Sequence, residues 1–391
     1  MDRSSVTLHT QTLTIGSAAH TTFGAGSING LAAAVRSFGG RRAFLVTDRG
    51  LVSSGLCAEV TAELTAAGLE VAVYSDLRPN PGIADIEAGA RALRQAGEAV
   101  VIGLGGGTSL DGAKAISLAA ANDLPIRELD YRKAPPNPGQ PVIAVPTTAG
   151  TGSETNSFAV IDDHEAQRKF YVGNETVAPK VVILDPDLTV GLPPAATAAS
   201  GVDALTHSLE SLMARNRNPY ARALDLQVIE MVHRWLPVAM ETGDDLEARA
   251  QMLLAAHLAG LAFATTGLGL VHALGHTLSA QLGTAHGVAL AVVLPSVMEV
   301  NLSARTAELA QAGVALSAAP GQSEDAAARA AIELVRVLMK RLGMPTTLTE
   351  LGLKKDGVPG LVRGALDDVV LANNPVHPTT QELTVVVESL L

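Results

Sequence analysis

A chain of 391 residues exceeds the size at which one hydrophobic core usually stops growing, so two domains are expected. Apolar residues make up 47% of the composition and charged residues 17%, which argues against an intrinsically disordered chain. The formal net charge of −11 argues against nucleic-acid binding and against an anionic membrane surface, because both need a basic face.

The sole thiol, Cys57, excludes an intrachain disulfide and fits a reducing compartment. The first 25 residues lack the basic end and the apolar run of a signal peptide. The most apolar stretch, around residues 252–274, is interrupted by histidines and glycines and is interpreted as buried core, not as a membrane span. The cytoplasm is therefore the expected location.

The first half of the chain alternates strand-like and helix-like segments. Expected strands lie at residues 6–15, 43–47, 71–74, 99–104, 142–145 and 181–184, with helical stretches at 83–95 and 110–121. Strands alternating with helices predict a parallel sheet with covered faces. Residues 1–195 are therefore predicted to form an α/β, Rossmann-like nucleotide-binding domain.

The composition changes after the proline-containing segment 185–200. Ala- and Leu-rich helical patterns then dominate, at residues 201–214, 221–235, 246–264 and 326–342. Residues 196–391 are therefore predicted to form a second, all-helical domain.

A glycine-rich turn follows the expected strand at 99–104 and opens a helix. Its residues are Gly105, Gly106, Gly107, Thr108 and Ser109. Backbone N–H groups in such a turn can approach a phosphate at the positive end of the helix. The turn lacks the third glycine of the standard dinucleotide fingerprint and the lysine of a P-loop. A tight turn without a ligand is the alternative interpretation.

A second loop, PTTAGTGSE at residues 146–154, follows the strand at 142–145 and contains Thr147 and Thr148. Hydroxyls and glycines at the carboxyl end of a parallel strand lie where α/β sheets bind ligands. The alternative interpretation is a capping box in which Thr151 and Glu154 open a helix. Both interpretations can hold together.

Two pairs of polar residues, one of aspartate with histidine and one of two histidines, occur at helical spacing in the second half of the chain. Asp203 and His207 are four residues apart, so a helix places them on one face about 6 Å apart. His272 and His276 repeat that spacing. A single histidine is usually structural, but this apolar region offers little water to solvate so many polar groups. They therefore need one another or a cation.

His286 follows fourteen residues after His272, which in one straight helix would place it about 21 Å away. Gly283 and Gly287 flank His286, so a helix break there is expected to fold the chain back. A small metal site built from Asp203, His207, His272 and His286 is then geometrically possible. One carboxylate and three imidazoles suit Fe²⁺ or Zn²⁺, and such an ion can act as a Lewis acid.

Six segments together resemble the iron-containing (group III) alcohol dehydrogenases over residues 23–375. They are FGAG at 23–26, VTDRG at 46–50, GLGGGTSLDGAKAI at 103–116, PTTAGTGSE at 146–154, SGVDALTHSLE at 200–210 and GLVHALGHTLSAQLGTAHGVA at 269–289. The resemblance implies the dehydroquinate synthase-like fold, with a nucleotide-binding α/β domain and an all-helical metal-binding domain. It also implies a metal-dependent, NAD(P)-linked alcohol dehydrogenase or aldehyde reductase, a homodimer, that interconverts a small alcohol and its aldehyde.

The resemblance carries over to single residues. Asp203, His207, His272 and His286 match the four metal-ligand positions, with Fe²⁺ expected and Zn²⁺ as the alternative. His276 looks like the family's active-site histidine that is not a ligand, and a proton relay is the role expected for it, with orientation of a ligand as the alternative.

Positions that line the dinucleotide are matched by Gly106, Gly107, Asp111, Thr147, Thr148 and Lys169. Asp48 matches the residue that favours NAD(H) over NADP(H), because a carboxylate there accepts a hydrogen bond from the ribose 2′-hydroxyl and repels a 2′-phosphate. The neighbouring Arg49 could partly accommodate that phosphate.

Related families remain alternatives. Maleylacetate reductases are expected as the nearest relatives, although they typically lack the full ligand set. Glycerol dehydrogenases use zinc and three ligands, and dehydroquinate synthases share the fold but are lyases. A catalytically silent binding protein would have lost a ligand.

Two aromatic residues, Phe158 and Phe263, are expected by family position to approach the substrate pocket, with core filling as the alternative. Residues 260–293 contain no Arg or Lys to pair with a substrate carboxylate. A short-to-medium aliphatic or weakly polar aldehyde is therefore expected over glycerol or a dicarboxylate.

Overall fold

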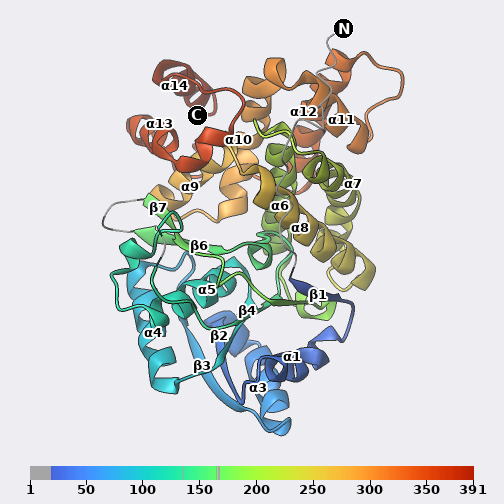
Figure 1. Cartoon of the computed structure of the whole chain (residues 1–391). Helices are drawn as coiled ribbons and strands as arrows, with labels where there is room; N and C mark the ends of the chain where they lie inside the picture. The colour runs from blue at the N-terminus through green and yellow to red at the C-terminus, as the bar shows by residue number, and fades with distance from the viewer. Residues whose placement is uncertain (1–18, 134, 164, 166–167) are drawn as a thin grey trace, which may run out of the picture. The chain divides into compact units, whose positions relative to one another are not determined.

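The computed structural model describes residues 19–133, 135–163, 165 and 168–391, and the strand expected at 6–15 lies outside them (Figure 1). The chain forms two compact units. The α/β unit contains the described residues up to Gly201 together with Trp235–Gly260, and the helical unit contains Val202–Arg234 and Leu261–Leu391. An α/β fold followed by an all-helical fold confirms the predicted fold class.

A six-stranded parallel sheet forms the centre of the α/β unit. Its strands are β1 (His20–Phe23), β2 (Arg42–Asp48), β3 (Glu70–Leu77), β4 (Val100–Gly105), β5 (Val142–Pro146) and β8 (Val181–Leu184), in the order β1-β8-β5-β4-β2-β3. β4 and β5 are buried along their whole length, as expected of parallel strands covered on both faces. β1 was not predicted, because its sequence HTTF is short and mostly exposed.

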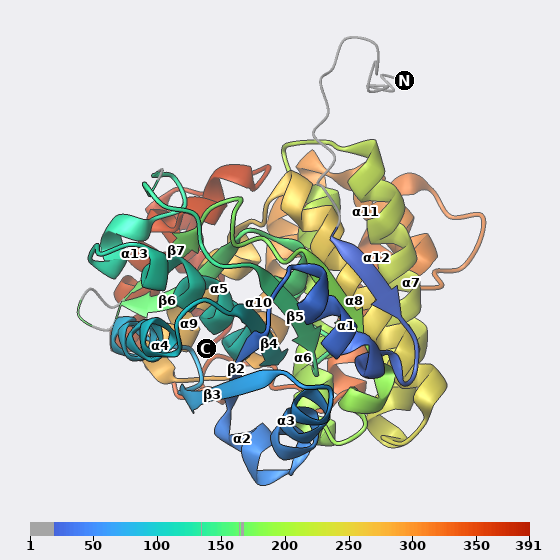
Figure 2. The same ribbon diagram turned by 60° about the horizontal axis from the view of Figure 1, so that its bottom comes forward.

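Helices cover both faces of this sheet, as Figure 2 lets the reader follow. They are α1 (Leu31–Ser37), α2 (Arg49–Ser53), α3 (Leu56–Ala66), α4 (Ile83–Ala96) and α5 (Gly107–Ala121). Successive side chains of β2 enter opposite cores. Phe44 packs with α4 and α5, whereas Leu45 packs with α1 and α3. The alternation shows why a continuous apolar run is required in a strand buried on both faces.

An antiparallel hairpin of β6 (Phe158–Asp163) and β7 (Arg168–Gly173) packs against α5. Ile161 and Phe170 belong to the same core cluster as α4 and α5. This hairpin was not predicted from the sequence.

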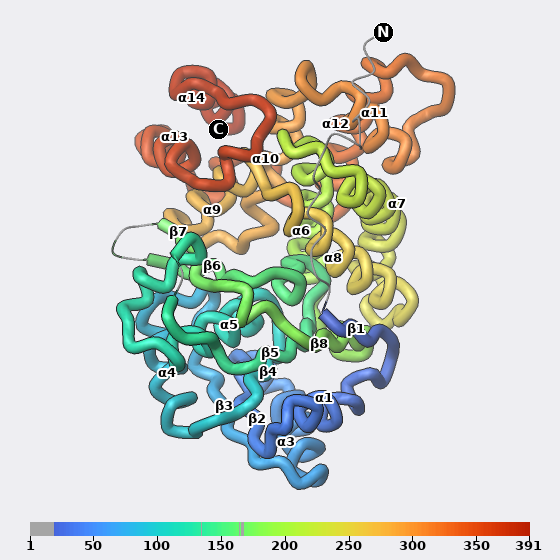
Figure 3. Tube along the Cα trace, viewed as in Figure 1, coloured from blue at the N-terminus to red at the C-terminus, as the bar shows by residue number. Residues whose placement is uncertain are grey.

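The second half of the chain is helical, as predicted, and its path is traced in Figure 3. Its helices are α6 (Pro194–Met213), α7 (Pro219–Glu241), α8 (Leu246–Thr266), α9 (Leu270–Leu282), α10 (His286–Asn301), α11 (Thr306–Ala315), α12 (Glu324–Arg341), α13 (Val358–Asp367) and α14 (Thr380–Glu388). Single 3₁₀ turns lie at Ser27–Gly30, Ile126–Leu129, Ser153–Thr155, Pro186–Thr189, Leu302–Ala304, Lys355–Gly357 and Val369–Asn373. The first three helices of this half contribute residues to both units.

The helix break predicted at Gly283 is present. Gly283 follows the last residue of α9 with φ +67°, a left-handed conformation that glycine adopts without a steric penalty. α10 then begins at His286 and packs against α9. The segment His286–Ala304 is long and apolar enough to cross a membrane, but 67% of its most apolar 18-residue window is buried inside the protein, so it is a core helix.

Candidate active site

The four predicted metal ligands lie together in the helical unit. Asp203 and His207 occupy successive turns of α6, His272 lies in the first turn of α9, and His286 begins α10. One oxygen, Oδ1 of Asp203, lies 3.5 Å from Nε2 of His207, 3.6 Å from Nε2 of His272 and 3.7 Å from Nε2 of His286. Three imidazoles therefore surround one carboxylate oxygen.

These distances fit a bound divalent metal better than they fit hydrogen bonds. Ligand atoms around a tetrahedral ion, at bond lengths of about 2.0–2.2 Å, lie about 3.4 Å apart. Asp203 Oδ1 and His272 Nε2 are both buried and have no hydrogen-bond partner among the described residues. Such atoms are costly to bury, and a cation would satisfy both. Asp203, His207 and His272 also meet the spatial requirements of a metal-ligand group.

The carboxylates and imidazoles of the cluster shift one another's pKa values. Burial acts to raise the pKa of Asp203, but the surrounding imidazoles outweigh it and hold this pKa well below its ordinary value. Burial acts to lower the pKa of His272, but the carboxylates of Glu210 and Asp203 outweigh it and raise this pKa to about 9. A metal must displace the His272 proton, so metal binding should weaken as the pH falls.

Glu210 contacts the cluster, and the sequence analysis did not single it out. It lies one turn after His207 on α6; its Oε1 accepts a hydrogen bond from the Val271 backbone N–H at 2.6 Å, and its Oε2 pairs with Nδ1 of His272. The spacing of Asp203, His207 and Glu210, four and then three residues, places all three on one face of the helix. That spacing was the available signal.

His276 lies beside the cluster without belonging to it. Its ring stacks on that of His286, with centroids 5.4 Å apart and an interplanar angle of 12°. Its Nδ1 pairs with Oδ2 of Asp368 at 2.8 Å. Asp368, just before the 3₁₀ turn Val369–Asn373, is 92 residues away in sequence, and nothing in the sequence pattern connects the two.

The two phenylalanines expected near the substrate have different surroundings. Phe263 is buried on α8, and its ring centroid lies 4.5 Å from that of His207. Phe158 instead packs edge-on against Tyr171, in an aromatic group that includes Tyr131.

The predicted phosphate loop opens α5 at the carboxyl end of β4. Gly106 precedes the first residue of α5, and no side chain caps that helix terminus. Thr147 donates its backbone N–H to the Gly105 carbonyl at 3.0 Å, which ties the loop after β5 to the loop after β4. An uncapped helix N-terminus beside a hydroxyl-bearing loop is suited to a phosphate group.

Close packing explains the glycines of this loop. A Cβ added to Gly106 would lie 3.1 Å from Thr148 Cγ2, and one added to Gly107 would lie 2.8 Å from Thr151 Cγ2. Gly105 has φ +145°, and a Cβ there would collide with Ser109. The backbone of the glycine-rich loop therefore lies directly against the side chains of Thr148 and Thr151.

Asp48 ends β2, the neighbour of β4, and caps α2. Its Oδ1 accepts hydrogen bonds from the N–H groups of Gly50 at 2.8 Å and Leu51 at 3.1 Å. Its Oδ2 accepts a 3.4 Å hydrogen bond from the Ser109 hydroxyl, so Asp48 lies beside the phosphate loop. The guanidinium of Arg49 is paired with Asp76 at 2.9 Å.

Asp111 belongs to a buried network around Lys114. Nζ of Lys114 lies 3.0 Å from Asp111 Oδ1 and donates to the Ser153 carbonyl at 2.8 Å, and burial lowers the pKa of this lysine. Oδ2 of Asp111 accepts the Val160 backbone N–H at 2.9 Å. The pair thus fixes the segment after the second loop to α5.

Lys169 lies on β7, where its Nζ donates to Asn80 Oδ1 at 3.0 Å and lies 3.6 Å from Asp162 Oδ1. No measured contact joins it to the glycine loop among the described residues.

The capping box of Thr151 and Glu154, the alternative interpretation of this loop, does not form. A short 3₁₀ turn, Ser153–Thr155, begins there, and Oε1 of Glu154 instead pairs with Nδ1 of His257 on α8 at 3.0 Å. Glu154 therefore pairs with a buried histidine distant in sequence and not with the backbone of Thr151.

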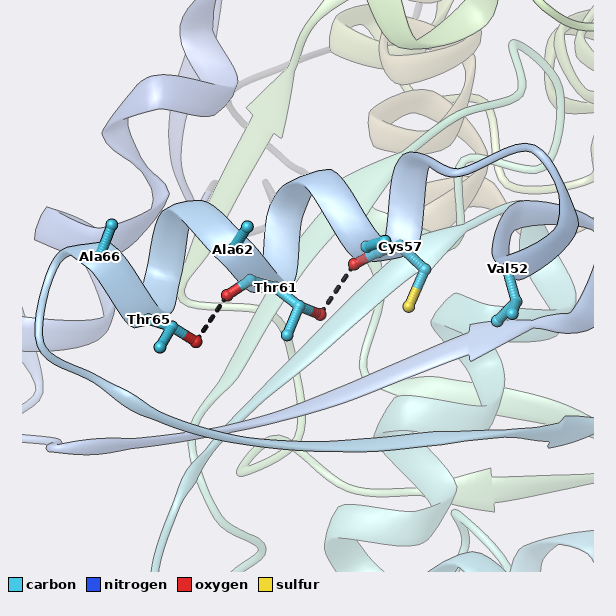
Figure 4. A pocket seen from close by; sticks show the side chains of 7 residues that line it. Val52, Cys57, Thr61, Ala62, Thr65 and Ala66 are labelled. Atoms are coloured by element: carbon cyan, nitrogen blue, oxygen red, sulfur yellow. Dashed lines mark hydrogen bonds between the residues drawn. The ribbon is translucent and has the colours of Figure 1, made fainter.

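A hollow along α3 is the contrasting case (Figure 4). It is lined by Val52, Cys57, Ala58, Thr61, Ala62, Thr65 and Ala66. The hydroxyls of Thr61 and Thr65 donate to carbonyls of their own helix at 2.7 and 2.8 Å, and burial raises the pKa of the Cys57 thiol. The hollow therefore offers little polar chemistry.

An uncapped glycine-rich helix terminus and a buried carboxylate–imidazole cluster are the parts expected of a metal-dependent, dinucleotide-linked dehydrogenase. Two family models match the chain: "Iron-containing alcohol dehydrogenase" over residues 18–186 and "Fe-containing alcohol dehydrogenase family, C-terminal" over residues 197–391. The chain belongs to the iron-containing alcohol dehydrogenase family.

Similar proteins agree with this assignment. An NAD-dependent methanol dehydrogenase of Bacillus methanolicus is 36% identical over 94% of this chain and 97% of its own length. A lactaldehyde reductase of Escherichia coli (strain K12) is 36% identical over 92% of this chain and 95% of its own length. The crystal structure of a 1,3-propanediol oxidoreductase superposes with a TM-score of 0.94 at 33% identity, covering 97% of this chain and 100% of that one.

These relatives correct one expectation. They carry the names of alcohol dehydrogenases and aldehyde reductases, so maleylacetate reductases were wrongly expected as the nearest relatives.

Proposed function

We propose that this protein is a metal-dependent, NAD-linked alcohol dehydrogenase or aldehyde reductase that acts on a small alcohol and its aldehyde. The observation that carries the proposal is the convergence of three imidazole Nε2 atoms on one oxygen of Asp203. An isolated hydrogen-bond network does not account for this donor set, because two of its buried atoms, Asp203 Oδ1 and His272 Nε2, have no hydrogen-bond partner among the described residues.

The metal would be held by Asp203, His207, His272 and His286. Fe²⁺ is proposed from the family, and Zn²⁺ suits the same carboxylate and imidazole donors. The bound ion would supply Lewis-acid polarisation of the substrate carbonyl. The protein's part is to fix the donors: α6 carries two of them one turn apart, and the break at Gly283 brings the fourth back beside the third.

The dinucleotide is proposed to bind at the carboxyl ends of β2, β4 and β5. Its phosphates would be held by Gly105, Gly106, Gly107, Thr108, Ser109, Thr147 and Thr148. Asp111 and Lys169 would also line the dinucleotide. The bound nicotinamide would accept or donate the hydride. A methanol dehydrogenase named as NAD-dependent, and a sulfoacetaldehyde reductase from Bifidobacterium kashiwanohense solved with NAD⁺ (TM-score 0.87, 28% identity), support NAD as the cofactor.

Asp48 supports NAD(H) over NADP(H). Its carboxylate lies beside the phosphate loop, where it would accept the ribose hydroxyl and repel a 2′-phosphate. The ion pair of Arg49 with Asp76 leaves the nearby cation already neutralised.

His276 is proposed as the catalytic proton carrier. Asp368 accepts the hydrogen bond from Nδ1–H of His276, which leaves Nε2 as the atom that takes up or releases a proton. Its position against the His286 ring keeps it beside the cluster.

The substrate proposed is a short-to-medium aliphatic or weakly polar aldehyde. Phe263 presents an apolar ring next to His207, and residues 260–293 contain no Arg or Lys to bind a substrate carboxylate. The names of the lactaldehyde reductase and the methanol dehydrogenase support a small substrate. A homodimer, a cytoplasmic location and a domain division after residue 195 are part of the same proposal.

Metal analysis of the purified protein, combined with kinetics, tests the function. We expect stoichiometric divalent metal, loss of activity in chelator, and faster reduction of butanal than of maleylacetate, with glycerol oxidised slowly. NADH should give a higher kcat/KM than NADPH. An active enzyme without divalent metal would overturn the proposal, and a hundredfold preference for maleylacetate would overturn the substrate assignment.

A further inference from the structure

The carboxylate of Glu210 joins the two helices that carry most of the Asp203 cluster. Glu210 lies on α6 with a side chain only 1% exposed. Both of its oxygens are used on α9: Oε1 accepts the Val271 backbone N–H at 2.6 Å, and Oε2 pairs with Nδ1 of His272. One side chain therefore binds the start of α9 and a proposed metal ligand on it.

The surroundings are built to receive this carboxylate. A Cβ at Gly269 would lie 3.2 Å from Oε1 of Glu210, so the backbone before α9 passes close to it. α9 begins at Leu270, and the positive end of a helix stabilises a carboxylate. These contacts offset the large cost of burying a negative charge.

The geometry fixes the orientation of His272. With Nδ1–H held by Glu210, Nε2 is the nitrogen that faces Asp203, at 3.6 Å from its Oδ1. Carboxylates that hold the second nitrogen of a ligating histidine fix its tautomer and ring orientation. Glu210 also adds a second negative charge to that of Asp203, so that the two together balance a divalent cation.

We propose that Glu210 is a positioning residue that holds His272 in its ligating orientation and completes the charge balance of the site, and that it thereby determines how tightly a divalent metal is retained. This inference rests on the proposed function, because it requires metal to bind the Asp203 cluster.

The test is Co²⁺ binding by the full-length protein after chelator treatment and dialysis. Glu210→Gln keeps the side-chain volume but offers one acceptor oxygen where two are used. We expect it to bind Co²⁺ about 10–100-fold more weakly than the wild type, and to alter the visible absorption bands of bound Co²⁺. Asp225→Asn is the control: it makes the same acid-to-amide replacement at a buried carboxyl group on α7 that is bonded to the Ser211 hydroxyl, and it should bind Co²⁺ within about twofold of the wild type.

A double-mutant cycle separates positioning of His272 from a general packing role. If Glu210 acts through His272, Glu210→Gln should cost little further affinity in a His272→Ala background. An equal loss in both backgrounds would overturn the positioning role, as would wild-type affinity in Glu210→Gln. Should Glu210→Gln not fold, Glu210→Asp keeps the charge and shortens the reach, and it should also bind Co²⁺ more weakly. A wild type that binds no Co²⁺ would instead overturn the metal site itself.

Discussion

At the scale of single residues, Asp48 combines a structural role with a proposed role in cofactor selection, and a mutation has to separate the two. Its Oδ1 caps α2, while the carboxylate as a whole is proposed to select NAD(H). Asp48→Gly would remove the side-chain cap, which typically costs about a few tenths of a kcal/mol for glycine, together with the charge. Asp48→Asn keeps a good cap and removes only the charge.

We therefore expect Asp48→Asn to narrow the preference for NADH over NADPH by about 10-fold, equivalent to about 1.4 kcal/mol. The measurement is kcat/KM for each cofactor at a fixed aldehyde concentration, with the melting temperature as a control for the cap. An unchanged ratio would show that selectivity arises elsewhere in the cofactor loops.

Asp225 is a buried acid whose role is separate from the active site. Burial raises its pKa well above the ordinary value, against a smaller opposing effect of hydrogen bonds from Ser211 and Ser208. The folded protein therefore holds this proton more tightly than the unfolded chain does. Its stability should fall as the pH rises above the unfolded pKa, which is about 3.9.

Asp225→Asn should remove this pH-dependent cost. At pH 7 we expect a gain of about 1–3 kcal/mol in the free energy of unfolding, because the wild-type carboxyl is ionised in the unfolded chain and has to take up a proton on folding, whereas asparagine does not titrate. Below about pH 4 the gain should disappear, because the wild-type acid is then neutral in both states. Denaturant unfolding at several pH values measures this, and a gain that does not vary with pH would contradict the assignment.

At the scale of elements, the segment after α13 acts on α9. Asp368 accepts the Val370 backbone N–H at 3.0 Å through Oδ1 and pairs with His276 through Oδ2. Asp368→Asn keeps the first contact, but it weakens control of the His276 tautomer. We expect kcat to fall about 10–100-fold, with bound metal and KM for NADH little changed. If metal content fell in proportion to kcat, Asp368 would instead belong to the metal site.

What could be predicted from the sequence depended on how local the signal was. The strands β2, β4 and β5 are apolar runs, and the Asp203–His207 pair is four residues apart, so each was readable within one segment. The position of His286 beside Asp203 and His207 could be predicted because Gly283 indicates a helix break between His272 and His286. The contacts of Glu154 with His257 and of His276 with Asp368 span 103 and 92 residues, and no local pattern encodes them. β1 was missed because HTTF contains one apolar residue, and the β6–β7 hairpin was missed because the short apolar runs of FAVIDD and RKFYVG lack the alternation that marks a half-buried strand.

At the scale of the whole molecule, the two sets of proposed site residues fall in different compact units. The four metal-ligand residues belong to the helical unit, whereas Asp48, the glycine loop and the Thr147 loop belong to the α/β unit. Because each unit has its own packing, metal binding and dinucleotide binding should be separable by experiment.

Removal of the metal is therefore expected to abolish aldehyde reduction while leaving NADH affinity within about twofold. It should also lower the melting temperature, because a ligand present at 100 times its Kd contributes about 2.7 kcal/mol to the folded state. Chelator treatment followed by NADH fluorescence titration and calorimetry measures both effects, and re-addition of Fe²⁺ or Zn²⁺ identifies the ion that restores activity.

His286→Ala should reproduce the chelated protein without chelator, since it removes one of the three imidazoles around Asp203. Loss of NADH binding together with the metal would show that the two sites depend on one another, and full activity in chelator would show that the cluster has no catalytic ion.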